Sequence, residues 1–330
     1  MRGLNKKKIL ITGGAGFIGH HVIEYFLNHT DCEIISLDRI DTSCNLGRIH
    51  TMLESNSEWR SRLRVVWHDL KAPINDYVAA QIGPVDYILH LAAGSHVDRS
   101  VKNPLQFVLD NVVGTTNLLE YVRSYLPDLE IFLNFSTDEV FGPAVDGVTF
   151  AEDDRHNPCN PYSASKSAAE QMCNAYGVTY NIPVITTHTM NVYGIRQNNE
   201  KFIPLVIEKL RANEKVSIHT DKEGNIGARK YLHTLDVSRA LLLLMQSGKI
   251  GEKYNISSDI EVDNLTLAQE IASIVGVTLR YNLEYPAQTR GVNDIRYSIS
   301  GEKIREMGWT PRLSIREGLE DVIEWYLENN

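Results

Sequence analysis

A tyrosine and a lysine stand four residues apart in the segment Asn160-Pro-Tyr162-Ser-Ala-Ser-Lys166. On a helix this spacing places both side chains on one face, one turn apart. A lysine cation at that distance stabilises a phenolate, so Tyr162 can act as a general base toward a hydroxyl group while hydride leaves the same carbon. Such pairs are common on helix surfaces, so this chemistry depends on the neighbouring elements.

Two adjacent carboxylates follow an apolar run that ends at Ser136. They belong to the sequence Thr137-Asp138-Glu139, and the run before them predicts a buried strand. Ligands of open α/β sheets bind outside the carboxyl ends of the strands, so both carboxylates are expected in a cleft. Elimination of water needs a base for one carbon and an acid for the hydroxyl leaving the next carbon, and this pair can supply both. A solvated turn is the simpler alternative.

A glycine-rich loop occurs near the N-terminus, in the segment Ile9-Leu-Ile-Thr-Gly13-Gly14-Ala-Gly16-Phe-Ile-Gly19. It leads from a predicted strand through a tight turn into a predicted helix. Glycines let the backbone approach a pyrophosphate, which then contacts the exposed N–H groups of the helix. The expected cradle comprises Gly13, Gly16, Phe17, Ile18 and Gly19.

An acidic residue, Asp38, ends the second predicted strand, 19 residues after Gly19. A carboxylate in this position accepts hydrogen bonds from the adenosine ribose hydroxyls, which predicts NAD as the cofactor. The neighbouring Arg39 is the feature that would suit the 2′-phosphate of NADP. Asp69 and Leu70 follow the third strand and are expected beside the adenine, although Asp69 could instead cap the strand end.

Short apolar runs alternate with amphipathic stretches through the first half of the chain. This order predicts an α/β fold, a Rossmann-type doubly wound parallel sheet covered by helices on both faces. The predicted strands are Lys8–Thr12, Glu33–Asp38, Leu63–His68, Val85–Leu91, Glu130–Ser136 and Val184–His188, and the predicted helices are Phe17–Asn28, Pro104–Tyr125 and Pro161–Tyr180.

The alternation ends at about residue 188. Beyond it the pattern predicts helices at Phe202–Arg211, Val237–Gln246, Leu267–Val275, Gly301–Met307 and Ile315–Glu328, with a polar loop at Thr220–Ala228. We therefore expect an NAD-binding domain at residues 1–187, rejoined by about 231–257. A smaller, mixed substrate-binding domain is expected at 188–330, mainly 188–230 and 258–330.

Composition excludes several classes of protein. The 330 residues are 43% hydrophobic and 23% charged, with a formal net charge of −9. Proteins that bind a phosphate backbone need clustered lysine and arginine, so no nucleic-acid partner is expected. No stretch approaches the roughly 20 apolar residues that span a bilayer. We therefore expect no membrane partner. The four cysteines form no CxxC pair and the histidines form no HExxH motif, so we expect no metal and a cytoplasmic location.

These features together resemble the extended short-chain dehydrogenase/reductase family, which uses a tyrosine, a lysine and a serine or threonine around a nicotinamide. The segment Thr137-Asp138-Glu139-Val-Phe141-Gly142 is similar to the TDEVYG motif of nucleoside-diphosphate-glucose 4,6-dehydratases, with Phe141 replacing tyrosine. Related decarboxylases and GDP-mannose dehydratases carry serine before the glutamate. Asp138 is therefore the discriminating residue.

The resemblance extends over nearly the whole chain. Ser95-His96-Val-Asp-Arg-Ser100 is similar to the SHVDRS loop, and Asn191-Val-Tyr-Gly194 and Glu200-Lys201-Phe-Ile-Pro204 are similar to the NNYG and EKLIP segments. The resemblance implies that His96, Asn191 and Lys201 face the substrate together with Thr137. Nucleotide and diphosphate contacts are implied for His219, Arg229, Asn264 and Arg296.

Some positions depart from the family pattern, mostly on the substrate side. Gly94 stands where a glutamate is usual, His219 where an aromatic ring commonly stacks on the pyrimidine, and Asn293 where a histidine is usual. The stretch Asp221–Ala228 carries a short insertion. These departures leave the nucleotide and the sugar open.

The implied activity is that of a dTDP-glucose or UDP-glucose 4,6-dehydratase, an NAD-dependent lyase. Tyr162, poised by Lys166, would remove the C4 hydroxyl proton, and Thr137 would hydrogen-bond the C4 oxygen. Glu139 would remove the C5 proton and Asp138 would protonate the departing C6 hydroxyl. The alternatives are a nucleotide-sugar 4-epimerase or decarboxylase of the same fold, or a non-catalytic NAD-binding protein. Two long predicted helices with many apolar positions suggest a homodimer.

Overall fold

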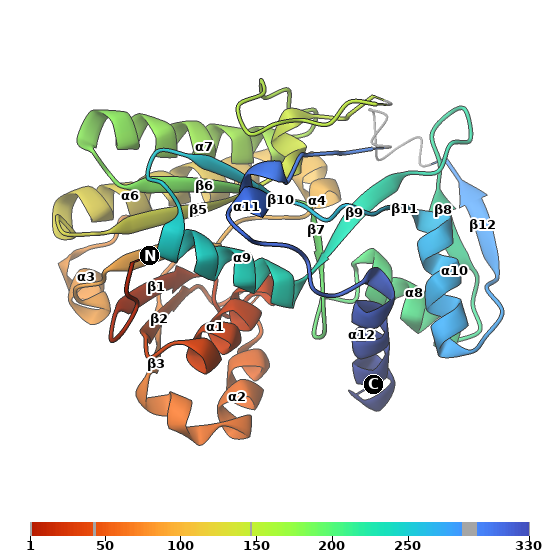
Figure 1. The fold of residues 1–330 in the computed structure, drawn as a ribbon, viewed down its shortest axis with the longest axis horizontal. Coiled ribbons are helices and arrows are strands. Elements are labelled where there is room, and N and C mark those ends of the chain that lie inside the picture. The colour runs from red at the N-terminus through yellow and green to blue at the C-terminus, as the bar shows by residue number, and fades with distance from the viewer. Residues whose placement is uncertain (1, 42–43, 146, 286–295, 330) are drawn as a thin grey trace.

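The centre of the fold is a seven-stranded sheet in which all neighbours are parallel (Figure 1). A computed structural model describes residues 2–41, 44–145, 147–285 and 296–329. The strand order is β10-β6-β5-β4-β1-β2-β3. The strands are β1 (Lys8–Thr12), β2 (Glu33–Asp38), β3 (Leu63–Trp67), β4 (Tyr87–His90), β5 (Ile131–Thr137), β6 (Val184–Thr189) and β10 (Lys253–Ile256).

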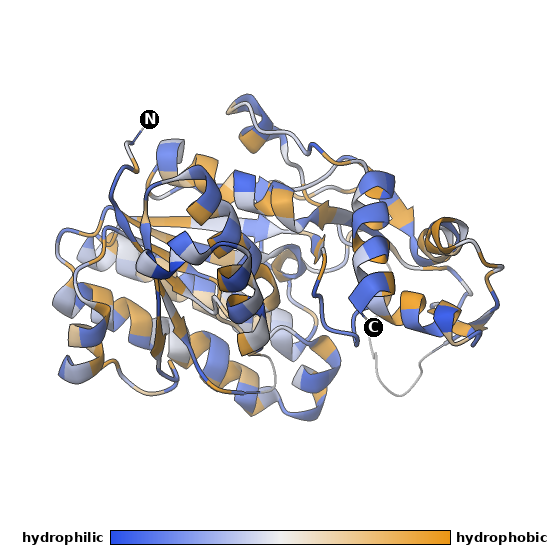
Figure 2. Ribbon diagram, turned by 90° about the horizontal axis from the view of Figure 1, so that it is seen from below, coloured by the Kyte–Doolittle hydropathy of each residue, from blue (hydrophilic) through white to orange (hydrophobic). Residues whose placement is uncertain are grey.

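Helices cover both faces of this sheet, which explains why its strands are almost continuously apolar. Ile9 and Ile11 of β1 join a core with α1 (Phe17–His29), α2 (Leu46–Ser55) and α9 (Thr234–Ser247). Leu10 points to the opposite face, where α3 (Asp76–Ile82), α6 (Gly114–Tyr125) and α7 (Pro161–Tyr180) contribute to a second core. Hydrophobic residues concentrate along the central strands in Figure 2. The predicted doubly wound α/β fold is confirmed.

One predicted helix, Pro104–Tyr125, is wrong as a single α-helix. It consists of α5 (Pro104–Phe107), a π-helical segment η2 (Val108–Val113) and α6. The wider turn accompanies two buried contacts: Asn111 bonds both backbone groups of Gly94, and Asp110 bonds Arg39. Such π-turns occur mostly at functional sites. The sequence did not reveal the π-helical segment, because one extra residue in a helical turn barely changes the spacing of the apolar residues.

A smaller unit lies beside the sheet and has its own core (Figure 1). It contains a mixed three-stranded sheet, β11-β9-β7, and a parallel pair, β12-β8. Its elements are β7 (Asn191–Tyr193), α8 (Phe202–Arg211), β8 (Val216–His219), β9 (Ala228–His233), β11 (Glu261–Asp263), α10 (Asn264–Val275), β12 (Tyr281–Glu284) and α12 (Ile315–Asn329). The remaining short helices are η1 (Ser57–Ser61), α4 (Val97–Lys102), η3 (Asp138–Phe141) and α11 (Glu302–Glu306).

The predicted polar loop at Thr220–Ala228 folds as a tight turn before β9. The Asp221 carboxylate accepts the Asn225 backbone N–H at 2.7 Å and its side-chain amide at 2.8 Å. Gly224 has a φ of +88°, which other residues adopt with strain. In the described part of the chain, the helices are too short or too polar to cross a bilayer.

Candidate active site

The carboxyl ends of the central strands open onto a cavity of about 390 Å³. The cavity lies where the strand order reverses, between β1 and β4, as expected for ligand sites in doubly wound sheets. All of the residues predicted to bind the cofactor or to catalyse line it: Gly13, Gly16, Phe17, Ile18, Gly19, Asp38, Asp69, Leu70, Thr137, Asp138, Glu139, Tyr162 and Lys166.

The glycine loop is packed so tightly that side chains would not fit. Gly13 has a φ of +72°, and an added Cβ would lie 2.9 Å from the Cα of Ala92. A Cβ on Gly19 would lie 2.1 Å from the carbonyl oxygen of Gly13. Gly16 is the N-cap residue of α1 and brings no side chain between the cavity and the helix N-terminus. These features fit the cradle that a pyrophosphate requires.

The ribose end of the cavity is built around Asp38. Its carboxylate is 6% exposed and accepts hydrogen bonds from the Ala15 N–H at 3.0 Å and from the Ser36 hydroxyl. Burial raises the pKa of Asp38. The neighbouring Arg39 guanidinium makes a two-pronged ion pair with Asp110 and donates from Nε to Asp41 at 2.6 Å. Because Arg39 is held by these carboxylates, the arrangement favours an unphosphorylated ribose.

Asp69 both caps a strand end and lines the cavity. Its carboxylate accepts the Lys71 N–H at 3.0 Å and lies 3.6 Å from Arg39. The cap of the strand end is confirmed, and the contact with adenine stays a prediction.

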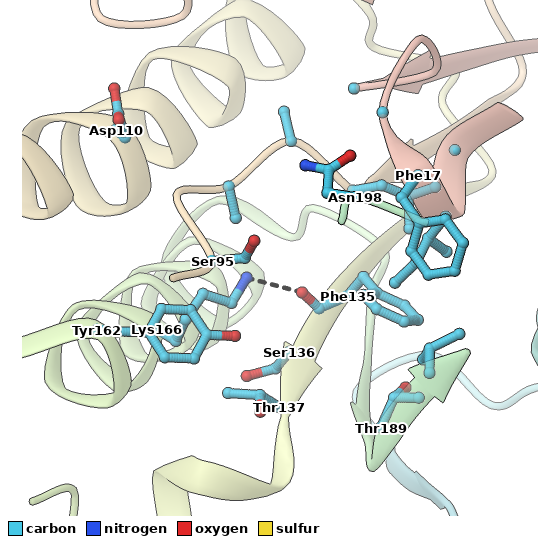
Figure 3. A pocket seen from close by; sticks show the side chains of 18 of the residues that line it. Phe17, Ser95, Asp110, Phe135, Ser136, Thr137, Tyr162, Lys166, Thr189 and Asn198 are labelled. Carbon is cyan, nitrogen blue, oxygen red and sulfur yellow. Dashed lines mark hydrogen bonds between the residues drawn. The ribbon is translucent and has the colours of Figure 1, made fainter. Parts of the chain in front are cut away.

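Tyr162 and Lys166 lie together on the cavity side of α7 (Figure 3). The helix begins with a capping box in which Asn160 and Ser163 exchange hydrogen bonds, and this fixes the first turn that carries Tyr162. Lys166 Nζ donates to the Phe135 carbonyl oxygen of β5 at 2.7 Å. Burial lowers the pKa of Lys166 to about 8.

Three features of the surroundings act on the pKa of Tyr162. Burial raises its pKa, and the charge of Glu139 raises it further, whereas a hydrogen bond with Thr137 works in the opposite direction. Its hydroxyl lies toward Ser136 and Thr137 at the end of β5 (Figure 3). The side chain is therefore placed to transfer a proton with a ligand bound at this strand end.

The acidic pair belongs to a buried turn. Thr137 ends β5, accepts the Glu139 N–H at 3.3 Å and donates to the Asp138 carboxylate at 2.9 Å. Asp138 is 5% exposed. The side-chain amide of Asn160, at the start of α7, donates to Glu139 at 3.1 Å. Both carboxylates line the same cavity as Tyr162, so the solvated-turn alternative does not describe them.

Sequence reasoning missed Asn111, which links the Gly94 loop to the catalytic helix. Its amide donates to the Gly94 carbonyl at 3.1 Å and to Ser165 Oγ at 2.8 Å, and its Oδ1 accepts the Gly94 N–H at 2.7 Å. An asparagine inside a predicted helix is a weak signal because helix propensity disfavours it only slightly. Asp110, Ser95, Asn198 and Tyr231 also line the cavity and were not predicted.

The predicted substrate residues divide into two groups. Asn191 and Lys201 line the cavity, and burial lowers the pKa of Lys201. His96 is the N-cap residue of α4, where its Nδ1 accepts the Arg99 N–H, and it is placed next to Ser95 of the cavity wall. Burial lowers the pKa of His96.

The other four predicted substrate residues lie outside the cavity lining, in the smaller unit. His219 ends the β8 strand and is exposed. Arg229 stacks on the Tyr297 ring at 5.1 Å, and Arg296 pairs with Glu261 at 2.8 and 3.0 Å. Asn264 reaches the cavity indirectly, because its Oδ1 accepts the hydroxyl of Tyr231 at 3.4 Å. Asn293 lies outside the described residues.

Fold and cavity together define an enzyme of the dinucleotide-dependent kind, in which a glycine cradle and a Tyr–Lys pair face one crevice. Comparison with known proteins narrows the class. The family model described as GDP-mannose 4,6 dehydratase matches residues 10–322, and the chain therefore belongs to this family.

Individual relatives agree with this assignment. The dTDP-glucose 4,6-dehydratase of Haemophilus influenzae is 34% identical over 340 residues, covering 98% of both proteins. The crystal structure of DesIV, a dTDP-glucose 4,6-dehydratase from Streptomyces venezuelae with NAD and TYD bound, has a TM-score of 0.87 and 32% identity and covers 98% of this chain and 97% of that chain. UDP-glucose 4-epimerase of Thermotoga maritima has a TM-score of 0.85 at 24% identity, covers 97% of this chain and 99% of that chain, and shares the fold.

These findings confirm the resemblance to the extended short-chain dehydrogenase/reductase dehydratases and the prediction of an enzyme. The predicted NAD cofactor agrees with the NAD bound in the Streptomyces structure.

Proposed function

We propose that this protein is a nucleotide-sugar 4,6-dehydratase that converts dTDP-glucose or UDP-glucose to the 4-keto-6-deoxy sugar with bound NAD. The observation that carries the proposal is that buried Asp138 and half-buried Glu139 line the same cavity as Tyr162 and Lys166. A 4-epimerase needs only the Tyr–Lys pair. Two further carboxylates beside it supply the acid and the base that loss of water requires.

The first step is removal of a proton from the C4 hydroxyl by Tyr162. When bound, NAD supplies a hydride acceptor for C4 and later a hydride donor for C6. Lys166 is ionised below its pKa of about 8, and its charge stabilises the Tyr162 phenolate, the form that accepts this proton. The Thr137 hydroxyl, which bonds Tyr162, is placed to hydrogen-bond the C4 oxygen as charge develops there.

The second step is loss of water across C5 and C6. A ketone at C4 acidifies the C5 proton, which Glu139 removes. The Asn160 amide bonded to Glu139 holds this carboxylate in place. Asp138, fixed by the Thr137 hydroxyl, protonates the departing C6 hydroxyl.

We also propose a division of labour between the two units. Residues 1–187, with about 231–257, would bind NAD, because β10 pairs with β6 and α9 packs on α1. Residues 188–230 and 258–330 would bind the sugar nucleotide. The sugar would be contacted by His96, Asn191 and Lys201. The nucleotide end would be contacted by His219, Arg229, Asn264 and Arg296. Binding of the diphosphate then requires Arg229 and Arg296 to leave their present partners.

The direct test is product analysis without added cofactor. Purified protein is incubated with dTDP-glucose, UDP-glucose and UDP-N-acetylglucosamine, and loss of water is followed by mass. One of the two glucose nucleotides should give the 4-keto-6-deoxy product. Isomerisation without loss of water would make the protein an epimerase.

Single substitutions test the two carboxylates separately. Glu139→Gln should accumulate bound NADH absorbance without dehydrated product, because C4 oxidation remains possible. Asp138→Asn should retain C5 proton exchange with solvent while loss of water slows by ~10²–10⁴-fold. Asp153→Asn, an exposed acidic residue on the following loop, is the matched control. Near-normal dehydration in both variants would refute the proposed roles.

We further propose a cytoplasmic homodimer. All four cysteines are free, as expected in a reducing compartment. An apolar strip on α4, α5 and η2 is exposed, comprising Val101 (48%), Leu105 (66%), Val108 (43%) and Leu109 (36%). Such a strip suits a two-fold interface between copies of the chain. Light scattering should report a dimer, and a monomer at micromolar concentration would refute it.

A further inference from the structure

A buried ionic cluster lies behind the Tyr–Lys pair, on the same face of α7. Glu170 follows Lys166 by one helical turn, and its side chain is 1% exposed. Three basic side chains from other elements contact its carboxylate: His188 of β6 at 3.0 Å, Lys253 of β10 at 3.2 Å and His156 at 3.4 Å. One carboxylate thus ties α7 to two strands and to the segment before the helix.

The neighbours of His188 define its charge. The Asn255 amide nitrogen donates to the Phe150 carbonyl at 3.2 Å, so Asn255 Oδ1 is the acceptor for His188 Nδ1 at 2.9 Å. Nδ1 therefore carries a hydrogen, and Nε2 needs a second one to bond Glu170. Burial works to raise the pKa of Glu170, but the charges and hydrogen bonds of His188 and His156 hold it well below the usual range. The proton lies on the imidazole, and the contact is an ion pair.

Basic side chains of the cluster take the place beside Glu170 that a metal ion would take. In the described part of the chain, His156, Glu170 and His188 place their ligand atoms within 4.8 Å of one another, as a His₂Glu metal site would. A cation there would have to displace both the Lys253 ammonium and a proton of His188. The residues present supply the positive charge themselves.

The same imidazoles support the turn that carries the acidic pair. Phe141 ends η3 and is 1% exposed. Its ring lies edge-to-face against His188, with centroids 4.7 Å apart, and against His156 at 5.3 Å. His156 also bonds Ser167 of α7 through Nδ1 at 2.9 Å. The cluster therefore lies between the helix of Tyr162 and the turn of Asp138 and packs against both.

We propose that Glu170 is a positioning residue of this active site, which fixes α7 against η3 through His156 and His188 and places a negative charge one helical turn from the Lys166 ammonium. The roles of Tyr162 and Lys166 in this statement rest on the proposed function. Burial lowers the pKa of Lys166, and the negative charge of Glu170 opposes that effect.

The sign of the pH effect follows from the groups around Lys166. These are Tyr162, Glu170 and Cys173 on α7, His90 on β4, Asp138 and Glu139 on η3, and, beyond Glu170, His156, His188 and Lys253. Replacing Glu170 by glutamine removes a negative charge and leaves the cations, so the pKa of Lys166 falls. Loss of the ammonium then begins at lower pH, and the alkaline limb of the activity profile moves in the same direction.

The test compares Glu170→Gln, the double variant Glu170→Gln/His188→Gln and the control Glu152→Gln. The double variant removes opposite charges together, which keeps the test available if the single change leaves a buried cation that prevents folding. Glu152 is 8% exposed and bonds the backbone of β10 at Asn255. In Glu170→Gln the alkaline limb of kcat should move down by about one pH unit, and in the double variant, which also loses a cation, it should move down by less. The control should leave it in place.

A uniform loss of rate at every pH, with the limb unmoved, would reduce Glu170 to a packing residue and overturn the proposal. Trace acetylation of Lys166 with acetic anhydride, read by peptide mass spectrometry against pH, gives the same shift without any substrate. If the parent protein converts no glucose nucleotide, the proposed function is wrong. The labelling would still show whether Glu170 affects the protonation of Lys166. An unchanged labelling profile in Glu170→Gln would overturn the proposal.

Discussion

The choice between NAD and NADP can be altered at Asp38. Asp38→Asn keeps an oxygen that can accept the Ala15 N–H and removes the buried negative charge. The variant also leaves Arg39 in place beside the ribose site. We expect tighter NADP binding and weaker NAD binding.

The size of the effect follows from the surroundings of Asp38. A 2′-phosphate placed about 5 Å from the carboxylate, at an effective dielectric constant of about 20, is repelled by about 3 kcal/mol per unit charge. Loss of charged hydrogen bonds to the ribose weakens NAD by about 1.5–3 kcal/mol. Together these changes lower the preference for NAD by about 10³–10⁴-fold for one unit of phosphate charge, at 1.4 kcal/mol for each factor of ten.

The assay is titration of cofactor-free protein with NADH and NADPH, followed by their fluorescence. Asp128→Asn, an exposed acidic residue between α6 and β5, controls for the change of net charge. Asp110→Asn should raise NADPH affinity further in the Asp38→Asn background, because it releases Arg39. A preference for NADH that stays within threefold of the parent would refute the assignment of Asp38.

Three further outcomes are expected. Dehydration should be sustained below pH 8 and fall as pH rises through about 8, because Lys166 loses its proton there; a flat pH–rate profile between pH 7 and about 9.5 would contradict this. NAD should co-purify at close to one per chain and be released by heat, since hydride is borrowed and returned in one cycle; protein that is empty and consumes NAD stoichiometrically would contradict it. Asp236→Asn should lower the free energy of unfolding by about 3 kcal/mol, because it breaks a buried ion pair with Arg239 and weakens the hydrogen bonds from the backbone of Arg312 and Leu313. Urea denaturation measures this change, and a loss below about 1 kcal/mol would contradict the prediction.

The central sheet was predictable because its strands are buried on both faces. The bounds of the six predicted strands agree with the apolar runs to within two residues, and α7 agrees at both ends, whereas β10 was not predicted. At its N-terminus the Asn160-Pro161 pair is a strong helix start, and Asn181 in the left-handed region ends it. The short helices α2, α3 and α4 were missed because 6 to 10 residues give too few turns for a clear period.

The cavity residues of the glycine loop, of the end of β5 and of the start of α7 were predictable because each lies at a strand end or in a local motif. Contacts between distant segments were not. Arg39 forms an ion pair with Asp110, which lies 71 residues away in the sequence. Glu170 forms an ion pair with Lys253 of β10, a strand that follows the first segment of the smaller unit along the chain. On the substrate side, side chains such as Arg229 and Arg296 are placed by loops and ion pairs rather than by hydrophobic periodicity, which is why sequence does not give their orientation.

The separation between α7 and the turn η3 bears on how such an enzyme can diversify. In the proposed mechanism, oxidation at C4 uses Tyr162 and Lys166 of α7, whereas proton transfer at the neighbouring carbons uses Asp138 and Glu139 of the four-residue turn η3. A few codon changes in that turn can therefore redirect the fate of a ketone intermediate while the oxidation machinery stays intact. For protein design, η3 is a short segment in which substitutions can introduce new reactions into an existing fold.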